Sequence, residues 1–131
     1  MTQPRLTVTA AIIERDGTYL LAKRKPGGPR GGRWEFPGGK LEPGETDEQA
    51  LTRELHEELG VGCTVGRPEP SVIYDYPDIA VELRPYRVTV TGEPVPLEHD
   101  ALAWIPREGL LDTVLCGADV QIARRIVADG E

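Results

Sequence analysis

Short runs of apolar and β-branched side chains, separated by turn residues, mark the first part of the chain. Residues 6–13 form one such run and residues 18–22 form a second. Asp16-Gly17 stands between them, and an Asp-Gly pair in this setting is a strong signal for a tight β-hairpin. Residues 23–34 are dense in Gly, Pro and Arg, which predicts a surface loop. We therefore expect a hairpin that leads into an irregular segment.

The spacing of apolar residues changes to a helical period in the next part of the chain. Thr46 is a favourable N-cap, and Gln49 three residues later completes a capping-box pattern. Gly60 stands where a helix commonly ends in a left-handed residue. Between these limits an apolar stripe recurs every four residues and consists of Leu51, Leu55 and Leu59. This pattern predicts a helix with one face packed on a core.

The second half of the chain alternates strand-like runs with turns and closes with a second helical pattern. Strands are predicted at residues 62–74, 79–91 and 101–105, and turns at residues 76–78, 92–94 and 106–109, the last of which opens a short helical segment. Residues 118–128 predict an amphipathic helix, because Ile122 and Ile126 stand four apart. This order predicts an α/β fold, a sandwich built on a mixed β-sheet, in a single domain over residues 1–131.

Composition excludes several classes of protein. The chain has 131 residues, of which 39% are hydrophobic and 28% charged, and this balance is typical of a soluble globular domain. It has no apolar run near the ~20 residues of a membrane span. The first ten residues lack a long apolar stretch, so we expect no signal peptide and a cytoplasmic location. Cys63 and Cys116 are too few for a disulfide framework or a zinc cluster, and are interpreted as reduced thiols.

The charge balance limits the kind of partner. A net charge of −7 argues against binding to a nucleic-acid polymer, which requires a basic surface. A small phosphate-bearing molecule stays compatible, because divalent cations can lie between carboxylates and phosphates. The position of the acidic residues therefore matters more than their number.

Three carboxylates gather on one face of the first predicted helix. Glu54, Glu57 and Glu58 stand at i, i+3 and i+4. Taken alone, a solvated acidic face explains such a cluster equally simply. Just ahead of the helix, however, Gly38-Gly39 allow the backbone to approach a ligand and leave a carbonyl free to coordinate a metal. Carbonyls and carboxylates are the oxygen ligands that Mg²⁺ and Mn²⁺ prefer.

The spacing of this segment resembles the complete signature of the Nudix hydrolase family. The signature contains Gly39, five residues, Glu45, seven residues, Arg53-Glu54-Leu55, one residue, Glu57-Glu58, one residue and Gly60-Val61. No specified position departs from the family pattern. The resemblance implies a Nudix-type α/β/α sandwich and an enzyme that hydrolyses phosphoanhydride bonds with Mg²⁺ or Mn²⁺.

The resemblance also implies a metal site. Glu57 and Glu58 are expected to bind the ion directly, and Gly38 to offer its backbone carbonyl. Glu54 is expected to act as a further ligand, or to orient and deprotonate the attacking water. Glu98 lies where relatives supply an extra carboxylate from a loop, and an ordinary loop acid is the alternative.

The same resemblance assigns supporting roles around these glutamates. Arg53 is expected to complete the catalytic set by holding the glutamates through ion pairs, with Glu45 and Gly39 in support. The implied reaction converts a nucleoside triphosphate and water into a nucleoside monophosphate and pyrophosphate.

The flanking segments are similar to one branch of the family. The segment WEFPGGK before the helix, together with AAIIERDG, LLAKR and EHDALAWI, resembles MutT-type enzymes and their bacterial CTP pyrophosphohydrolase relatives. The resemblance implies a small-molecule nucleotide as the partner, oxidised or modified, such as 8-oxo-dGTP or a cytidine nucleotide. Another nucleoside diphosphate-linked substrate is an alternative, as is a non-catalytic nucleotide-sensing domain, although a sensing domain is expected to lose signature glutamates. Monomer and homodimer both stay open.

Four residues are candidates for substrate binding. Arg24 is expected to contact a substrate phosphate or the base edge, and a surface arginine is the alternative. Asp119 falls where MutT-type enzymes place an Asn or Asp that reads the base, and a helix N-terminal acid is the alternative. An Asp rather than an Asn changes the hydrogen-bond pattern that this position accepts, which argues against a simple 8-oxoguanine specificity and leaves cytidine nucleotides open. Leu6 and Val8 are candidate pocket residues with core packing as the alternative, and His99 is interpreted as structural.

Overall fold

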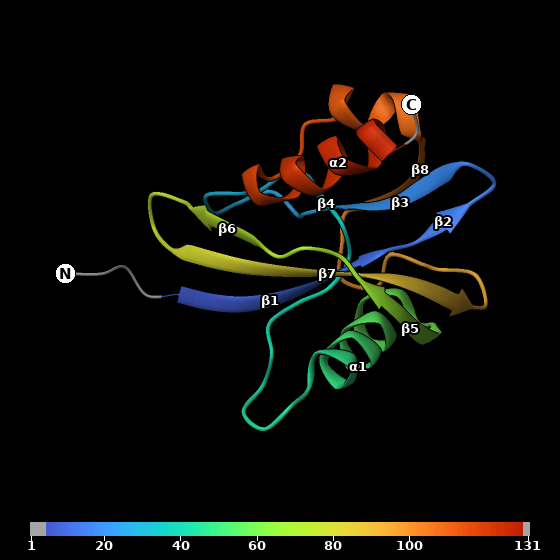
Figure 1. Ribbon diagram of the computed structural model, residues 1–131, viewed down its shortest axis with the longest axis horizontal. Coiled ribbons are helices and arrows are strands. Elements are labelled where there is room, and N and C mark those ends of the chain that lie inside the picture. The colour runs from blue at the N-terminus through green and yellow to red at the C-terminus, as the bar shows by residue number, and fades with distance from the viewer. Residues whose placement is uncertain (1–4, 130–131) are drawn as a thin grey trace.

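The chain folds into two four-stranded β-sheets between two helices, as the computed structural model shows for residues 5–129 (Figure 1). Residues 1–4 and 130–131, the two ends of the predicted domain, lie outside the described residues. The expectation of no signal peptide rests on residues 1–10, of which residues 1–4 are thus not described.

The first sheet is mixed, as the sequence predicted. It contains β1 (Arg5–Ile12), β5 (Gly62–Pro68), β6 (Val72–Asp75) and β7 (Ala80–Thr91). The long strand β7 pairs with β1 in parallel, and with β5 and β6 in antiparallel orientation. A parallel pair requires a long crossover connection. The chain between β1 and β7 supplies it, and the first helix lies within that stretch.

The second sheet is antiparallel throughout, and the sequence did not predict it as a separate unit. It contains β2 (Glu14–Arg15), β3 (Thr18–Lys23), β4 (Trp34–Glu35) and β8 (Ala101–Pro106). The predicted turn is confirmed, since Asp16 and Gly17 form the two-residue turn between β2 and β3 with φ of 51° and 78°. The first arm of the hairpin was predicted wrongly, because it is the short β2, whereas β1 pairs with β7 in the first sheet. Positive φ at both positions is the requirement of a type I′ turn.

Helix α1 (Asp47–Leu59) has the limits that the sequence predicted. The Thr46 hydroxyl accepts a hydrogen bond from the amide of Gln49 at 3.2 Å, and the Gln49 side chain accepts one from the Thr46 amide at 3.0 Å. Gly60 ends the helix in the left-handed conformation, with φ of 69°. The three leucines of the stripe are fully buried.

The two helices cover opposite faces of the β-structure, with α1 on one side and α2 (Gly117–Asp129) on the other (Figure 1). Successive residues of a strand point to opposite faces. Ala10 and Ile12 of β1 accordingly belong to the core beneath α2, whereas Ala11 and Leu20 belong to the core beneath α1. The predicted α/β/α sandwich is confirmed.

Some predicted limits were wrong. The loop predicted at residues 23–34 is shorter at both ends, because Lys23 in β3 pairs with Trp34 in β4 across the second sheet. The strand predicted at residues 62–74 divides into β5 and β6 around Pro70, which cannot donate a ladder hydrogen bond. Helix α2 is one residue longer at each end than predicted. The short helical segment after β8 is confirmed as η1 (Arg107–Asp112).

Two further observations bear on the composition. No helix within residues 5–129 is long and apolar enough to cross a membrane. Cys63 and Cys116 both carry free thiols.

Candidate active site

The three clustered glutamates of α1 differ in their exposure. The Glu57 side chain is 47% exposed, that of Glu54 16%, and that of Glu58 only 5%. The spacing predicted a common face, but the three side chains meet different surroundings on it, from solvent at Glu57 to the interior of the sandwich at Glu58. Glu58 is therefore a buried carboxylate, which is costly unless a cation or a proton compensates its charge.

Arg53 connects the helix glutamates to the loop ahead of the helix. Its guanidinium donates to both carboxylate oxygens of Glu45, at 2.7 and 2.9 Å, and to the carbonyl of Lys40 at 3.0 Å. It also donates to Glu54 at 2.8 Å and to Glu57 at 3.4 Å. These contacts lower the pKa of the Glu45 carboxyl to about 2, chiefly through the hydrogen bonds from Arg53. The structure thus brings together the residues that the resemblance assigned to this network.

Glu58 lies among other carboxylates. Burial, and then the neighbouring Glu54, Glu35 and Glu98 carboxyls, raise the pKa of Glu58 to about 10. Its Oε1 atom is buried and has no hydrogen-bond partner among the described residues. Such a group gains from a bound cation, which would replace the proton and occupy the free oxygen.

The donor set suits a hard divalent cation. The oxygen-bearing side chains of Glu54, Glu57, Glu58 and Glu98 and the backbone of Gly38 are the types that Mg²⁺ and Mn²⁺ accept. Within residues 5–129, no three His, Cys, Asp or Glu side chains already stand as a finished ligand cluster. The ligand types of these residues match a hard divalent cation. Binding of the ion would require the carboxylates to move closer together.

The two glycines ahead of the helix are required by close packing. The Gly39 carbonyl accepts hydrogen bonds from the amide and hydroxyl of Thr9 at 2.8 and 3.1 Å, which holds the loop against β1. A Cβ atom at Gly39 would collide with the carboxylate of Glu54, and one at Gly38 would collide with the backbone carbonyl of Thr9. Gly38 also has a φ of 153°. Glycine is therefore required at Gly38, where the obstacle is backbone, whereas a side chain at Gly39 would displace the Glu54 carboxylate.

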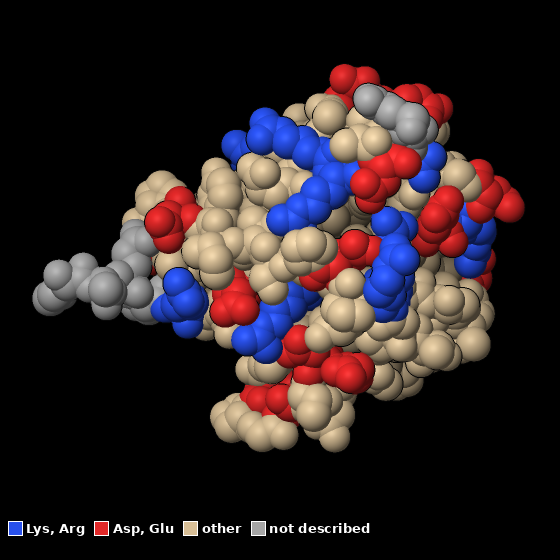
Figure 2. Space-filling view, viewed as in Figure 1, with Lys and Arg blue, Asp and Glu red and all other residues tan. Residues whose placement is uncertain are grey.

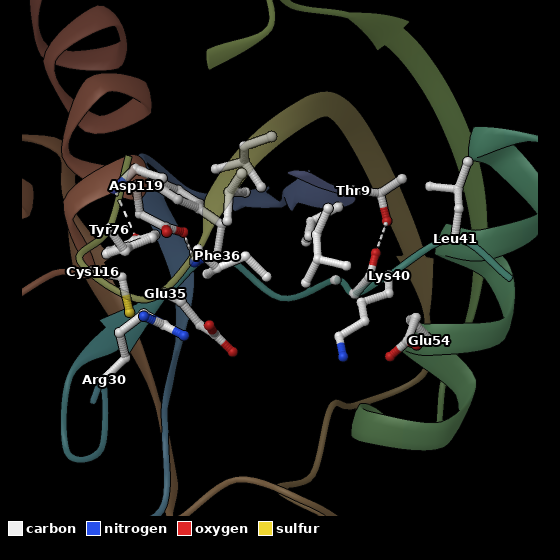
Figure 3. Close-up of a pocket in the computed structure, with 18 of the residues that line it drawn as sticks. Thr9, Arg30, Glu35, Phe36, Lys40, Leu41, Glu54, Tyr76, Cys116 and Asp119 are labelled. Carbon is white, nitrogen blue, oxygen red and sulfur yellow. Dashed lines mark hydrogen bonds between the residues drawn. The ribbon is translucent and has the colours of Figure 1, made fainter. Parts of the chain in front are cut away.

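A cleft of about 690 Å³ runs beside this cluster. This volume is within the usual range of small-molecule sites. The predicted substrate residues Leu6, Val8, Arg24 and Asp119 all line it, together with Gly38, Gly39, Arg53 and Glu54. Figure 3 shows Asp119 and Tyr76 at one end, near α2, and Lys40 and Glu54 at the other, near α1. The structure thus brings the base-reading and metal-binding candidates to opposite ends of one cleft.

A second hollow, of about 370 Å³, adjoins the cleft and is lined by two further residues of the predicted metal site. Glu58 and Glu98 line it, and it shares Arg24, Glu35 and Gly38 with the cleft. Glu57 and Glu45 line neither cavity. Glu98 therefore lines the same hollow as Glu58 and does not line the main cleft.

Asp119 is more than a helix N-terminal acid. It is 6% exposed, and its Oδ2 accepts a hydrogen bond from the amide of Phe36 at 2.9 Å. Burial, and then the nearby Glu35 carboxylate, raise the pKa of Asp119 to about 8. The side chain points into the cleft (Figure 3). The raised pKa favours the protonated carboxyl, which has one donor and free acceptor capacity.

Other walls of the cleft contain residues that the sequence patterns did not predict. Glu35 accepts a hydrogen bond from Arg24 at 3.1 Å. Arg30 forms two hydrogen bonds with Asp78, at 2.9 and 3.2 Å, and lies 4.4 Å from the centre of the Tyr76 ring. The position of Glu35 inside the segment before the glycines was a signal that could have found it. No local sequence pattern predicts the contact between residues 30 and 78.

The surface around the cleft carries both signs of charge. Figure 2 shows acidic and basic side chains next to one another across the middle of this face, without a continuous basic field. This distribution suits a small anion with a cation better than a long polyanion.

A cleft beside a helix of ion-paired glutamates, within an α/β/α sandwich, defines a class of hydrolases. The chain belongs to the Nudix family, whose NUDIX domain matches residues 3–129. It is a MutT-like Nudix hydrolase, an enzyme that acts on phosphoanhydride bonds. Nudix hydrolases in general use divalent metal ions.

Two curated relatives are similar over most of the chain. The CTP pyrophosphohydrolase of Escherichia coli (strain K12) is 41% identical over 124 residues, which cover 94% of this chain and 92% of that protein. The 8-oxo-dGTP diphosphatase of Proteus vulgaris is 41% identical over 90 residues, which cover 68% of this chain and 80% of that protein.

Two solved structures have the same fold. The solution structure of the E. coli ORF135 protein superposes with a TM-score of 0.85 at 40% identity, and the match covers 96% of this chain and 91% of that one. The MutT NUDIX hydrolase from Burkholderia pseudomallei superposes with a TM-score of 0.81 at 32% identity, covering 95% and 99%.

Proposed function

We propose that the chain is a Mg²⁺- or Mn²⁺-dependent nucleoside triphosphate pyrophosphohydrolase that acts on oxidised or modified nucleotides. The observation that carries this proposal is the buried Glu58 carboxylate, whose Oε1 has no hydrogen-bond partner among the described residues. It lies at a hollow that adjoins a nucleotide-sized cleft. The reaction converts a (d)NTP and water into a (d)NMP and pyrophosphate.

Glu54 would act on the attacking water, and Glu57, Glu58, the Gly38 carbonyl and Glu98 would hold the ion. When bound, it neutralises the polyphosphate, lowers the pKa of a bound water and stabilises the leaving pyrophosphate. Because all these donors are oxygen atoms, a hard cation is favoured over zinc.

The chain's own residues position the reacting groups. Arg53 fixes Glu54 through a hydrogen bond of 2.8 Å, and Gly39 leaves room for that carboxylate beside the loop. Glu54 lines the cleft, from which it orients the attacking water and accepts its proton. Arg24 binds a substrate phosphate at the junction of the two cavities and exchanges its contact with Glu35 to do so.

Asp119 reads the base at the far end of the cleft. A protonated carboxyl donates one hydrogen bond and accepts another. Cytosine offers an acceptor at its ring nitrogen beside the donor amino group, so the match supports cytidine nucleotides. Leu6 and Val8 line the cleft from β1 and supply apolar contact. The names of the two curated relatives support both a cytidine and an 8-oxoguanine nucleotide.

A pyrophosphate-release screen with Mg²⁺ tests this proposal. It covers ordinary, 8-oxo and 5-substituted (d)NTPs, with Glu57→Gln as the blank. We expect release that depends on Glu57 and disappears on addition of a chelator, with the order of kcat/KM identifying the base. Absence of turnover with every triphosphate would overturn the proposal and favour a diphosphate-linked substrate or a sensing role.

Metal binding has its own expected signature. Burial and the neighbouring carboxyls raise the pKa of Glu58, so an ion at this carboxyl displaces a proton and the affinity for Mn²⁺ rises with pH between 6 and 8. Thermal unfolding with and without Mn²⁺ measures this as a larger increase in Tm at pH 8 than at pH 6. An equal increase at both pH values, or one that persists in Glu58→Gln, would contradict a metal site at Glu58.

A further inference from the structure

One histidine with a largely buried side chain lines the second hollow. The His99 side chain is 8% exposed and lies in the loop between β7 and β8. Main-chain contacts anchor this loop on both sides. The amide of Leu97 donates to the carbonyl of Glu58 at 3.0 Å, and the amide of Asp100 donates to the carbonyl of Lys23 at 2.8 Å. The imidazole is thus held between α1 and β3.

Its two ring nitrogens face two different carboxylates. Nε2 lies 2.9 Å from Oε2 of Glu35. Nδ1 lies 3.7 Å from Oε1 of Glu58, which is too long for a hydrogen bond. Both atoms of this second pair are buried, and neither has a hydrogen-bond partner in the described part of the chain. Because buried polar groups are almost always paired, the two atoms mark a contact that a sub-ångström movement would complete.

Glu35 connects His99 to the nucleotide cleft. It accepts a hydrogen bond from Arg24 at 3.1 Å, and both residues line the cleft as well as the hollow. Side chains in contact therefore lead from Arg24 through Glu35 and His99 towards Glu58.

We propose that His99 is a positioning residue that orients Glu58 for metal binding and links it, through Glu35, to the nucleotide cleft. This inference rests on the proposed function, because it takes Glu58 as a metal ligand. His99 acts through that carboxylate and needs no contact with the nucleotide. Groups that orient a metal ligand typically contribute 10–100-fold to metal affinity.

Two amide substitutions of His99 test the contacts of its two ring nitrogens separately. A glutamine amide reaches the position of Nε2, and an asparagine amide reaches that of Nδ1. We expect His99→Gln, which keeps the contact with Glu35, to lower Mn²⁺ affinity about tenfold. His99→Asn, which keeps the contact with Glu58 but gives up the contact with Glu35, should lower the affinity only about threefold, as Glu35→Gln should. A merely structural histidine would not distinguish the two amides.

The measurement is a titration of the full chain with Mn²⁺ alone, with free ion followed by electron paramagnetic resonance. His56→Gln is the matched control, because His56 is an exposed histidine on α1 and should leave affinity unchanged. Wild-type affinity in His99→Gln, or equal losses in both His99 variants, would overturn the proposal.

A double-mutant cycle tests the link to the cleft. Glu35→Gln should weaken Mn²⁺ binding in the wild-type background and add little in the His99→Gln background. Additive losses would overturn the link. If thermal unfolding without metal shows that His99→Gln does not fold, Glu35→Gln carries the same test, since the proposal requires it to lower Mn²⁺ affinity.

Measuring pyrophosphate release as well as Mn²⁺ affinity distinguishes failure of the positioning role from failure of the proposed function. Pyrophosphate release by the wild type, with unchanged Mn²⁺ affinity in His99→Gln, would overturn only the positioning role. Absence of release by the wild type would overturn the proposed function, whereas the Mn²⁺ titrations would still test His99.

Discussion

The guanidinium of Arg53 holds the carboxylate of Glu45 through two hydrogen bonds, from Nε to Oε2 at 2.7 Å and from Nη2 to Oε1 at 2.9 Å. The remaining terminal nitrogen, Nη1, donates to Glu54 at 2.8 Å. Arginine is suited to this arrangement because its planar group donates two parallel hydrogen bonds to one carboxylate. One side chain therefore sets the position of the helix glutamates relative to the loop before them.

Replacing Arg53 by lysine should distinguish the effect of its positive charge from that of its two parallel hydrogen bonds. An ammonium group keeps the charge but cannot form the fork, so we expect kcat to fall on the order of 10²-fold with little change in KM. Steady-state kinetics with the best triphosphate measures this. Arg67→Lys, at an arginine whose side chain is 74% exposed, is the matched control and should behave as the wild type. A kcat within twofold of the wild type in Arg53→Lys would contradict the role of the fork.

The two glycines should fail in different ways when replaced by alanine. At Gly39 the added methyl group meets the mobile end of Glu54, so activity should fall on the order of 10²-fold with little loss of stability. At Gly38 it meets the backbone of Thr9 at a positive φ, so the free energy of unfolding should fall by about 1–3 kcal/mol. Activity assays and thermal unfolding of both variants give the comparison. Equal loss of stability in the two would argue against a specific conflict with Glu54.

Asp119 should make stability depend on pH. Burial, with the Glu35 carboxylate, raises its pKa from 3.8 to about 8. Between these values the folded chain retains a proton that the unfolded chain has lost, so the free energy of unfolding falls as pH rises from about 4 to about 8. In Asp119→Asn this titration is absent. The variant should therefore gain stability relative to the wild type, on the order of 1 kcal/mol per pH unit within the window and no further above it. Parallel curves of Tm against pH would show that Asp119 ionises normally.

The composition and position of the Gly/Arg loop at residues 26–33 lead to the hypothesis that it closes over substrate, and the contact between Arg30 and Asp78 provides a test. The pair joins the loop to the turn between β6 and β7 at the edge of the cleft. We expect Arg30→Ala to raise KM roughly fivefold, about 1 kcal/mol, without changing kcat, as for a residue that contributes uniform binding. Exchanging the two residues, Arg30→Asp with Asp78→Arg, should restore part of the affinity. An unchanged KM in Arg30→Ala would remove the loop from substrate binding.

Features that depend on near neighbours in the chain could be predicted before the fold was known. The limits of α1 follow from Thr46, Gln49 and Gly60, whose contacts span at most four residues. The Asp16-Gly17 turn follows equally from local backbone preference. By contrast, Trp34 was assigned to the loop, because its strand exists only through pairing with Lys23 across the second sheet.

The sequence by itself determined which residue types are available for chemistry and that Glu54, Glu57 and Glu58 share one side of a helix. Only the tertiary structure decided what surrounds each of them. Asp119 meets the amide of Phe36 across 83 positions of the chain, and His99 meets Glu35 across 64. Burial and the approach of other charges set the ionisation of a carboxyl group. Both depend on distance through space, so the burial of Glu58 and the raised pKa of Asp119 arise only when the sheets and helices pack together.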